Sequence, residues 1–400
     1  MKVLMLGWEL PPHNSGGLGT ACYQLCKALA KKDLDIEFIL PYQADHGINF
    51  MNITAAHPQG VSEVIRSGIA YDSYKYIKDD GSVEWVGIYE QQRLYEEAVA
   101  SIVGEKEFDI VHAHDWLTFK AALRVKRIKN CPIILHVHSI ESDRAGNNPG
   151  NPLVREIEEL ALHMADRVIA VSRHTKNAIV KEYGVPADKI EVVHNSIEPG
   201  DLSPLDDSNA YQYLTMMKSL GYRVVVNIGR LTIQKGLPNL LYAAKTVIEH
   251  APRTLFLIVG SGEQYYELIE QAAGLGIGDK VLFTDFQRGK TWRDAYAIGD
   301  LFVMPSVSEP FGLTPLEAIG YGTPALVSKQ SGVSEVLRNC LKVDFWDINE
   351  MANQIAAVVQ NDSLRDELLA NSSQEYNQLS WDMASDKVES LYRSHAVGTA

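Results

Sequence analysis

The chain has few cysteines, no long apolar run and no excess of positive charge. Four cysteines among 400 residues are too few for a disulfide-stapled scaffold. No stretch approaches the ~18 consecutive apolar residues of a membrane-spanning helix, and the first apolar run is too short for a signal peptide. The net charge is −14, so the surface as a whole repels nucleic acid and anionic lipid. We therefore expect a cytoplasmic protein with neither nucleic acid nor a membrane as a partner.

One segment is basic although the net charge of the chain is negative. KAALRVKRIKN, residues 120–130, gathers five cations on what we predict to be one helix: Lys120, Arg124, Lys126, Arg127 and Lys129. A solvated helix face fits this run, and so does a surface for a membrane or another polyanion.

Metal-binding spacings are also scarce. Cys22 and Cys26 lie four residues apart, on one face of a predicted helix, and this favours buried core thiols. The two His-x-His pairs, at 112–114 and 136–138, each end an apolar, strand-like run. Such pairs could bind a metal, but their position at the ends of these runs favours residues at the edge of a pocket.

Two series of short apolar segments, rich in β-branched residues, alternate with helical patterns. The first series comprises KVLMLG, IEFILP, DIVHAHD, PIILHVH and RVIAVS, and the second comprises RVVVNIG, LFLIVG, KVLFTDF, LFVMPS and PALVS. Such alternation is typical of doubly wound parallel sheets. Between the series, HNSIEPGDLSPLDDSN is rich in Pro, Asp and Ser and is typical of a linker. The sequence thus predicts an α/β protein with one domain over 1–199 and another over 200–381.

Ligands of open parallel sheets bind beyond the carboxyl ends of the strands. Arg230 and Lys235, in NIGRLTIQKG, flank such a strand end in the second half. Two loop cations exposed to solvent are one interpretation. The other is a site for an anionic leaving group, where each cation within ~4 Å would contribute roughly 4 kcal/mol before desolvation.

The first half offers a glycine-rich loop and two polar strand ends. HNSGGLGTA lacks the P-loop pattern, but its glycines precede a helix and let backbone N–H groups approach an anion or a sugar. A tight turn without a ligand is the alternative. Asp115 and His138 each follow a buried strand, and together they favour recognition of sugar hydroxyls over a purely structural role.

Two glutamates bracket the segment SEPFGLTPLEA. In TPLE, Thr314 is a predicted N-cap, Pro315 the first helical residue and Glu317 the third, which is a capping box. Glu309 precedes this helix, so the two carboxylates do not share a helix face and are not spaced as a glycosidase pair. Contacts from both carboxylates to one hydroxyl-bearing ligand fit better.

Together GGLG, HAHDW, a strand-end histidine, GRLTIQKG and EPFGLTPLE resemble the retaining GT-B glycosyltransferases, and among them the glycogen and starch synthase-like group. The resemblance spans nearly the whole chain. It implies two Rossmann-like domains facing a cleft, with a terminal helix over 382–400 that returns to the first domain. It also implies transfer of glucose, with retention, from ADP-glucose or UDP-glucose to an α-glucan, with no metal and no cofactor.

The resemblance assigns roles to residues as well. Arg230 and Lys235 would hold the donor diphosphate, Glu309 would contact the transferred sugar, and His138 would hydrogen-bond its 6-hydroxyl; these four form the predicted catalytic set. Glu317 would contact the ribose. The remaining predicted site residues would line the acceptor side (Asp115) and the donor side (Gly16, Gly17, Gly312, Leu313, Thr314).

The chain departs from the glycogen synthase pattern at one point. Asn14 and Ser15 precede Gly16 where those enzymes commonly carry a lysine, so one donor-side cation is missing. Transfer from another nucleotide sugar to a lipid, polysaccharide or small-molecule acceptor is the alternative function. An inactive sugar-binding module would not need leaving-group cations, and a sugar-nucleotide epimerase would need further acid–base residues that we do not find.

Overall fold

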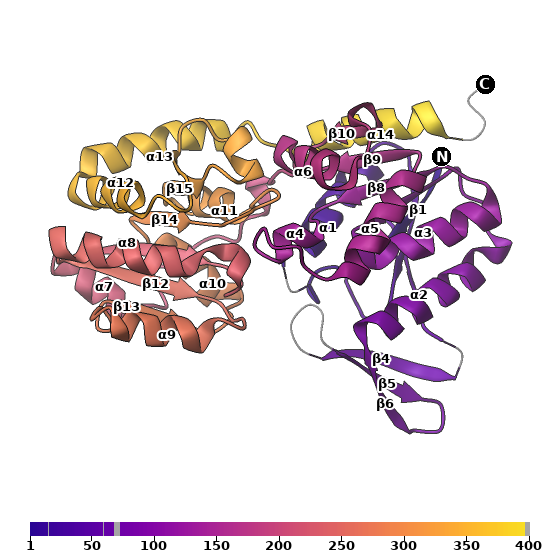
Figure 1. The fold of residues 1–400 in the computed structure, drawn as a ribbon, viewed down its shortest axis with the longest axis horizontal. Coiled ribbons are helices and arrows are strands. Elements are labelled where there is room, and N and C mark those ends of the chain that lie inside the picture. The colour runs from indigo at the N-terminus through magenta and orange to yellow at the C-terminus, as the bar shows by residue number, and fades with distance from the viewer. Residues whose placement is uncertain (15, 59, 68–72, 397–400) are drawn as a thin grey trace. The chain divides into compact units, whose positions relative to one another are not determined.

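The computed structural model describes residues 1–400 except Ser15, Gln59, residues 68–72 and residues 397–400. The chain divides into two compact units (Figure 1). The first unit contains residues 1–141, 151–195 and 381–400, and the second contains residues 142–150 and 196–380. The main division thus falls between Asn195 and Ser196, inside the Pro- and Asp-rich segment.

The first unit is built on a seven-stranded parallel sheet. Its strand order is β10-β9-β8-β7-β1-β2-β3, so the order reverses between β1 and β7. The strands are β1 (Lys2–Leu6), β2 (Asp35–Leu40), β3 (Asn52–Ala55), β7 (Ile110–His114), β8 (Ile133–Val137), β9 (Arg167–Ala170) and β10 (Ile190–Val192). Its longer helices are α1 (Gly17–Ala30), α2 (Ile88–Ile102), α3 (Trp116–Lys129), α5 (Pro152–Met164) and α6 (Arg173–Tyr183).

The last helix of the chain, α14 (Trp381–His395), belongs to the first unit. It packs beside α1, where Lys31 pairs with Asp382 at 3.1 Å and Lys32 pairs with Asp386. On its buried side, the Tyr392 hydroxyl lies 2.5 Å from Nδ1 of His112 in β7. The C-terminal segment is therefore part of the core that supports the sheet.

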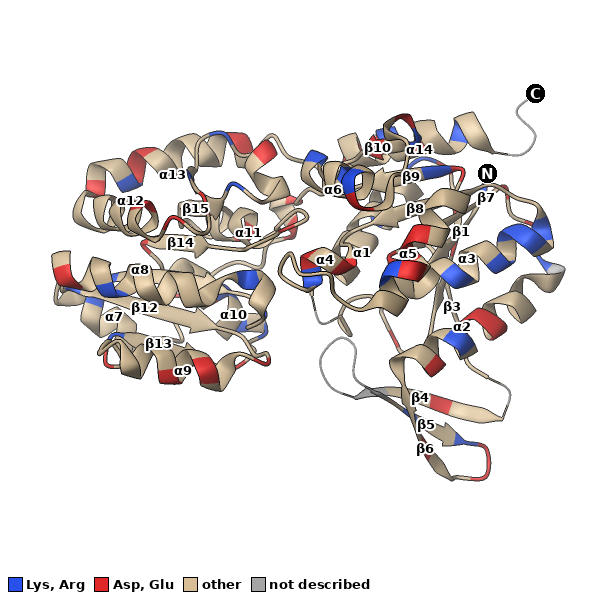
Figure 2. Cartoon of the chain, viewed as in Figure 1, with Lys and Arg blue, Asp and Glu red and all other residues tan. Residues whose placement is uncertain are grey.

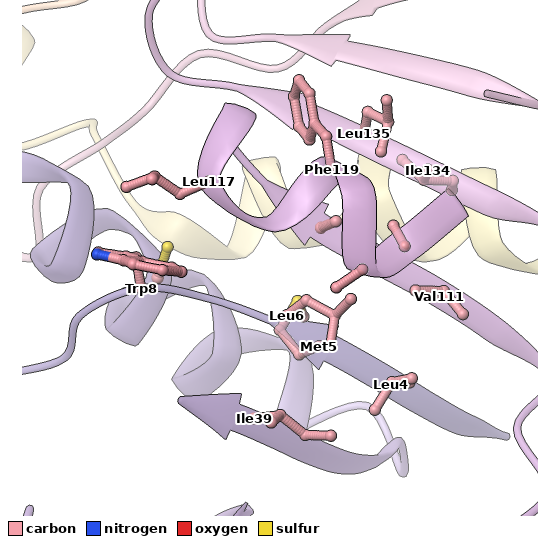
Figure 3. Packing of buried hydrophobic residues seen from close by; sticks show 14 of the residues in the cluster. Leu4, Met5, Leu6, Trp8, Ile39, Val111, Leu117, Phe119, Ile134 and Leu135 are labelled. Carbon is pink, nitrogen blue, oxygen red and sulfur yellow. The ribbon is translucent and has the colours of Figure 1, made fainter. Parts of the chain in front are cut away.

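The core of the first unit lies between the sheet and its helices. Figure 3 shows Leu4, Met5 and Leu6 of β1 between Ile39 of β2 and Val111 of β7, with residues of β8 and α3 beyond them. All five of these side chains are fully buried. Strands buried on both faces explain why the sequence shows continuous apolar runs here and no alternation.

A three-stranded antiparallel sheet also belongs to the first unit and is missing from the sequence-based prediction. It consists of β4 (Val61–Ser67), β5 (Ser73–Lys78) and β6 (Val83–Gly87). Asp80 and Gly81 form the β5–β6 turn, and Gly81 has a φ of 79°. An Asp-Gly pair between alternating segments is a hairpin signal that could have revealed this sheet.

The second unit repeats the doubly wound arrangement. Its six-stranded parallel sheet has the order β13-β12-β11-β14-β15-β16 and reverses between β11 and β14. The strands are β11 (Arg223–Ile228), β12 (Thr254–Val259), β13 (Val281–Thr284), β14 (Leu301–Met304), β15 (Ala325–Ser328) and β16 (Leu341–Val343). The helices are α7 (Gln212–Ser219), α8 (Leu237–His250), α9 (Tyr265–Gly274), α10 (Gly289–Ala297), α11 (Thr314–Gly320), α12 (Ile348–Gln360) and α13 (Asp362–Tyr376). The predicted pair of doubly wound parallel sheets is confirmed.

The basic segment at 120–130 does lie on one helix, α3, but acidic neighbours offset its charge (Figure 2). Arg124 pairs with Glu96 at 3.2 Å, Lys126 with Asp166 at 2.7 Å, and Lys129 with Glu107 at 3.2 Å. Partly exposed pairs of this kind contribute little stability, but they reduce the local positive potential. This pairing favours the solvated-face interpretation over a polyanion surface.

Candidate active site

Predicted site residues of the first unit lie where its strand order reverses. In doubly wound sheets this reversal opens a crevice at the carboxyl ends of the strands, where ligands bind. Gly16 and Gly17 follow β1, Asp115 follows β7 directly, and His138 follows β8 directly. Sequence reasoning identified the strand ends, and the topology brings them to one edge.

Asp115 ties two of these strand ends together. Its backbone N–H donates to the carbonyl of His136 at 3.0 Å, and its Oδ1 accepts from the N–H of His138 at 2.6 Å and of Ser139 at 3.3 Å. Its φ of 59° is unusual for a residue with a side chain. The predicted acceptor-binding residue therefore also has a structural role, because it fixes the backbone that carries His138.

Four histidine rings stack beside this edge, namely His112 and His114 of β7, His136 of β8 and His138 directly after β8. Rings two residues apart on one strand stack at centroid distances of 4.5 Å (His112 and His114) and 4.3 Å (His136 and His138). Between strands, His112 Nε2 lies 3.1 Å from His136 Nδ1, and His114 Nδ1 lies 2.9 Å from His138 Nε2. The Nε2 atom of His114 also lies 3.1 Å from the Met5 sulfur. We call these four residues the histidine cluster.

Burial keeps the histidine cluster neutral. It lowers the pKa of His112 and of His138 from 6.5 to about 3, and it lowers the pKa of His114 and His136 in the same direction. At neutral pH each imidazole thus has one N–H and one acceptor nitrogen, which the paired contacts require.

The cluster also brings possible metal ligands together, as the metal-binding alternative for the two His-x-His pairs would require. Two sets have ligand atoms within 4.8 Å of one another, namely Cys22 with His114 and His138, and His112 with His114 and His136. The cross-strand nitrogens point at each other as donor and acceptor, so hydrogen bonding accounts for their proximity. Cys22 and Cys26 are buried in α1, as predicted, and burial raises the pKa of both thiols.

The glycine loop after β1 contains two kinds of glycine. A Cβ atom at Gly16 would meet no atom within 4 Å, and both Gly16 and Gly17 are exposed at the start of α1. A Cβ at Gly19 would lie 2.6 Å from the Asn14 side chain and 3.1 Å from Glu9. Packing therefore requires Gly19, whereas Gly16 leaves the loop open at its surface.

The predicted cations of the second unit follow β11, at the reversal point of that sheet. Lys235 ends a short 3-10 turn, and its Nζ lies 2.5 Å from Oε2 of Glu309 in the segment after β14. Gly236 follows with a φ of 65°, and a Cβ there would lie 2.2 Å from the Pro305 carbonyl oxygen. The absence of a side chain at 236 thus allows the Lys235 loop to lie directly on the Glu309 segment.

Arg230 lies in the same loop and is half-buried. Within the described part of the chain, its guanidinium forms no hydrogen bond and no ion pair. Five N–H donors without a partner at a strand end suit a planar or tetrahedral anion. The loop therefore contains one cation fixed by a carboxylate and one cation available to a ligand.

Glu309 is held by its backbone as well as by its side chain. Its N–H donates to the Gln330 carbonyl at 2.9 Å, and its own carbonyl accepts from the N–H of Gly332 at 3.0 Å. The Ser306 hydroxyl donates to the same Oε2 that contacts Lys235, at 3.0 Å. Glu309 is only 8% exposed, so its carboxylate has a fixed position with two donors on one oxygen.

Glu317 has a different environment from the one predicted. The N-cap of α11 is Leu313, which is already helical with φ −79° and ψ −29°, and Thr314 is the first helical residue. The predicted capping box is therefore wrong. The Thr314 hydroxyl faces the Met304 sulfur at 3.9 Å, and Glu317 accepts a hydrogen bond from the Tyr296 hydroxyl at 2.6 Å.

Burial raises the pKa of Glu317 from 4.5 to about 7, although the Tyr296 hydrogen bond opposes this shift. A carboxyl with a raised pKa beside other strand-end polar groups is a common feature of functional sites. Nearby, Gly312 has a φ of 96°, and a Cβ there would lie 3.1 Å from the Glu309 side chain. Gly312 thus allows the chain to pass close to Glu309 before α11 begins.

The segment 142–150, which follows His138 and Glu141 in the chain, clusters with the second unit. The Ser308 hydroxyl donates to the Asp143 carboxylate, and Asn147 donates to the Val307 carbonyl at 3.4 Å. This segment therefore supports the backbone just before Glu309, a contact that the sequence did not indicate.

Two parallel-sheet α/β units with polar strand ends at their reversal points are consistent with the GT-B fold. Residues 15–201 match the family described as Glycosyltransferase Family 4, and residues 217–375 match the family described as Glycosyl transferases group 1. The chain therefore has the GT-B fold, and each of its two units matches a glycosyltransferase family model.

Relatives agree with this assignment. The chain is 27% identical to an uncharacterized glycosyltransferase of Methanocaldococcus jannaschii over 98% of both chains. It is 26% identical to the glycogen synthase of Mycobacterium tuberculosis over 85% of this chain and 80% of that one. Among solved structures, sucrose-phosphate synthase from Thermosynechococcus elongatus has a TM-score of 0.75 at 19% identity, covering 98% of this chain and 99% of that one. HepE of Anabaena, in complex with UDP-glucose, has a TM-score of 0.72 at 20% identity, covering 98% and 100%.

The described helices contain no segment that is both long enough and apolar enough to cross a bilayer.

Proposed function

We propose that the protein transfers glucose, with retention of configuration, from ADP-glucose or UDP-glucose to an α-glucan. The observation that carries this proposal is the ion pair of 2.5 Å between Lys235 and Glu309, next to Arg230, which has no partner among the described residues. A glycosyl donor leaves a diphosphate, whose growing charge requires cations fixed in advance. A sugar-binding module has no such requirement.

In the proposed reaction, the bond between the anomeric carbon and the diphosphate oxygen breaks, and a bond to the acceptor oxygen forms on the same face. The acceptor proton passes to an oxygen of the leaving phosphate. Arg230 and Lys235 stabilise the departing charge, and Glu309 contacts the sugar. No step uses a metal or a cofactor.

The other predicted residues complete the donor and acceptor sides in this proposal. His138 hydrogen-bonds the 6-hydroxyl of the donor sugar, and Glu317 contacts the ribose. Gly16, Gly17, Gly312, Leu313 and Thr314 line the donor, and Asp115 lies on the acceptor side. The glycogen synthase relative supports the glucan acceptor, and the UDP-glucose complex of HepE supports the donor class.

The decisive experiment measures release of nucleotide diphosphate from ADP-glucose, UDP-glucose and GDP-mannose, with and without maltooligosaccharides. We expect release from a glucose donor that depends on maltooligosaccharide, and a lengthened glucan as the product. Proton NMR of the first product should show an α-linkage. A β-linkage would contradict retention, and release that ignores maltooligosaccharide would contradict the glucan acceptor.

A second candidate is transfer to a small phosphorylated acceptor. The chain is 28% identical to a D-inositol 3-phosphate glycosyltransferase of Nocardioides over 72% of this chain and 67% of that one. The missing lysine before Gly16 also departs from the glycogen synthase pattern. Adding D-inositol 3-phosphate as an acceptor to the same assay, with each of the three nucleotide sugars in turn, separates the two candidates.

A further inference from the structure

The second unit has a groove that shares no residue with the candidate active site. Its volume is about 670 Å³, and it lies between α8, the end of α9 and the segment that leads into α12. Its lining includes Tyr242, Lys245, Glu249, Trp346, Asp347 and Asn349.

One wall of the groove is a single face of α8. Tyr242, Lys245 and Glu249 are spaced three and four residues apart, so their side chains project from the same side of the helix. Among the described residues, none of these three side chains has a hydrogen-bond or ion-pair partner. The wall therefore offers an aromatic ring and two unpaired polar groups to a ligand.

The opposite wall presents Trp346, which is 60% exposed, while Tyr242 is 48% exposed. The indole packs edge-on against Phe345, with ring centroids 4.9 Å apart. The backbone of this segment is fixed, because Asn239 donates to the Phe345 carbonyl at 2.9 Å and the Ile348 N–H donates to the Trp346 carbonyl at 3.1 Å. Trp346 is thus held in place although it is exposed. Binding of a ligand there would therefore cost little entropy for ordering this side chain and its loop.

The charges of the groove indicate the ligand class. The lining holds one cation, Lys245, and two acids, Glu249 and Asp347, so the groove does not attract a polyanion. The polar side chains around the rings also make it a poor match for a purely apolar ligand. A pyranose ring suits both features, because its C–H face carries slight positive charge that matches an aromatic face and its hydroxyls reach out to polar groups.

We propose that this groove binds a stretch of neutral α-glucan, with sugar rings against Trp346 and Tyr242. The choice of α-glucan rests on the function proposed above. The groove would hold a long acceptor polymer on the second unit while its end reacts elsewhere. Short acceptors would not use it.

The test measures binding without any nucleotide sugar. Titration with maltoheptaose, and electrophoresis through gels that contain glycogen, would compare the wild type with Trp346→Ala. We expect about tenfold weaker binding in the variant, a factor typical of the loss of a stacked aromatic contact. Trp85→Ala is the matched control, because Trp85 is 59% exposed on β6 of the other unit. The Trp346 and Trp85 variants should both unfold at the wild-type temperature.

The outcomes separate the two proposals. Equal binding by the wild type and Trp346→Ala, or no binding by the wild type at millimolar maltoheptaose, would overturn the groove even if glucan synthesis is observed. Binding that depends on Trp346 in a protein without glucosyltransferase activity would support the groove and overturn the proposed function. In an active enzyme, Trp346→Ala should raise the KM for glycogen and leave transfer to maltotriose unchanged.

Discussion

The two units differ in the polar groups that lie at the carboxyl ends of their strands. In the first unit, cross-strand hydrogen bonds join the neutral rings of the histidine cluster, and Asp115 accepts hydrogen bonds from backbone N–H groups. In the second unit, the same topological position carries Lys235 paired to Glu309, Glu317 with a raised pKa, and Arg230, which no described residue contacts as a hydrogen-bond or ion-pair partner. Among the described residues, the first arrangement leaves one buried ring nitrogen, His136 Nε2, without a partner, and the second leaves the Arg230 guanidinium without one.

This contrast should appear as opposite responses to pH. The depressed histidine pKa values mean that the unfolded chain binds more protons between about pH 3 and 6.5, so the histidine cluster contributes stability that is lost as pH falls through that range. For Glu317 the folded state binds more protons between pH 4.5 and about 7, so its burial costs stability as pH rises. Falling pH is thus expected to destabilise the histidine cluster of the first unit and rising pH the Glu317 region of the second.

Removing Lys235 from the candidate site of the second unit should have the largest effect. Lys235→Ala should lower kcat ~1,000-fold, because it removes a fixed cation from the departing diphosphate, with little change in the KM for acceptor. Steady-state kinetics with saturating donor would measure this.

Lys329→Ala is a suitable control, because Lys329 also pairs with a carboxylate, Asp344, at 2.8 Å in the same unit. Lys329→Ala should leave kcat nearly unchanged. Because Lys235 and Glu309 contact each other directly, the double variant Lys235→Ala/Glu309→Ala should lose less than the product of the two single losses. Wild-type turnover in Lys235→Ala would remove Lys235 from catalysis.

At the strand ends of the first unit, the expected effect is a loss of stability. Asp115→Ala leaves the N–H groups of His138 and Ser139 without their acceptor, which should lower the free energy of unfolding by ~2 kcal/mol. Urea denaturation would measure the change. Asp115→Asn retains an acceptor oxygen and should lose less than half as much. If the two variants are equally destabilised, charge and not hydrogen bonding is what Asp115 contributes.

A smaller effect is expected from the partner of His138. His114 Nδ1 lies 2.9 Å from His138 Nε2, so His114 acts as a positioning residue in the proposed mechanism. His114→Phe should lower kcat about tenfold, as losses of orienting hydrogen bonds commonly do. His114→Asn places an amide nitrogen near the position of Nδ1 and should restore most of the activity. Equal losses in the Phe and Asn variants would mean that the ring matters only for packing.

The smallest effect is expected from Glu317. Glu317→Gln keeps an acceptor for the Tyr296 hydroxyl and removes a buried ionisable group. The variant should melt a few degrees higher than the wild type at pH 8, with the difference vanishing near pH 4.5, where the wild-type carboxyl is protonated in the folded state. Differential scanning calorimetry across this range would measure it. If the difference in melting temperature between the variant and the wild type does not change with pH, ionisation of Glu317 does not cause that difference.

Much of the fold follows from local patterns. The apolar segments ending at Leu6, His114, Val137 and Ile228 are strands because β-branched runs bounded by turn residues have few alternatives. The antiparallel sheet over β4–β6 was missed because its strands alternate polar and apolar residues and do not form the continuous apolar runs of the two parallel sheets. The capping box at Thr314 was wrong because Leu313 is already helical, a backbone choice that a sequence motif does not decide.

The sequence by itself determined the two doubly wound sheets and the candidate residues at their strand ends, because hydrophobic periodicity and the position of polar residues are local properties. Only the tertiary structure decided which of these residues meet. His112 and His136 are 24 residues apart, and Lys235 and Glu309 are 74 residues apart. Their proximity depends on strand order and register, and these are set by the packing of the whole sheet.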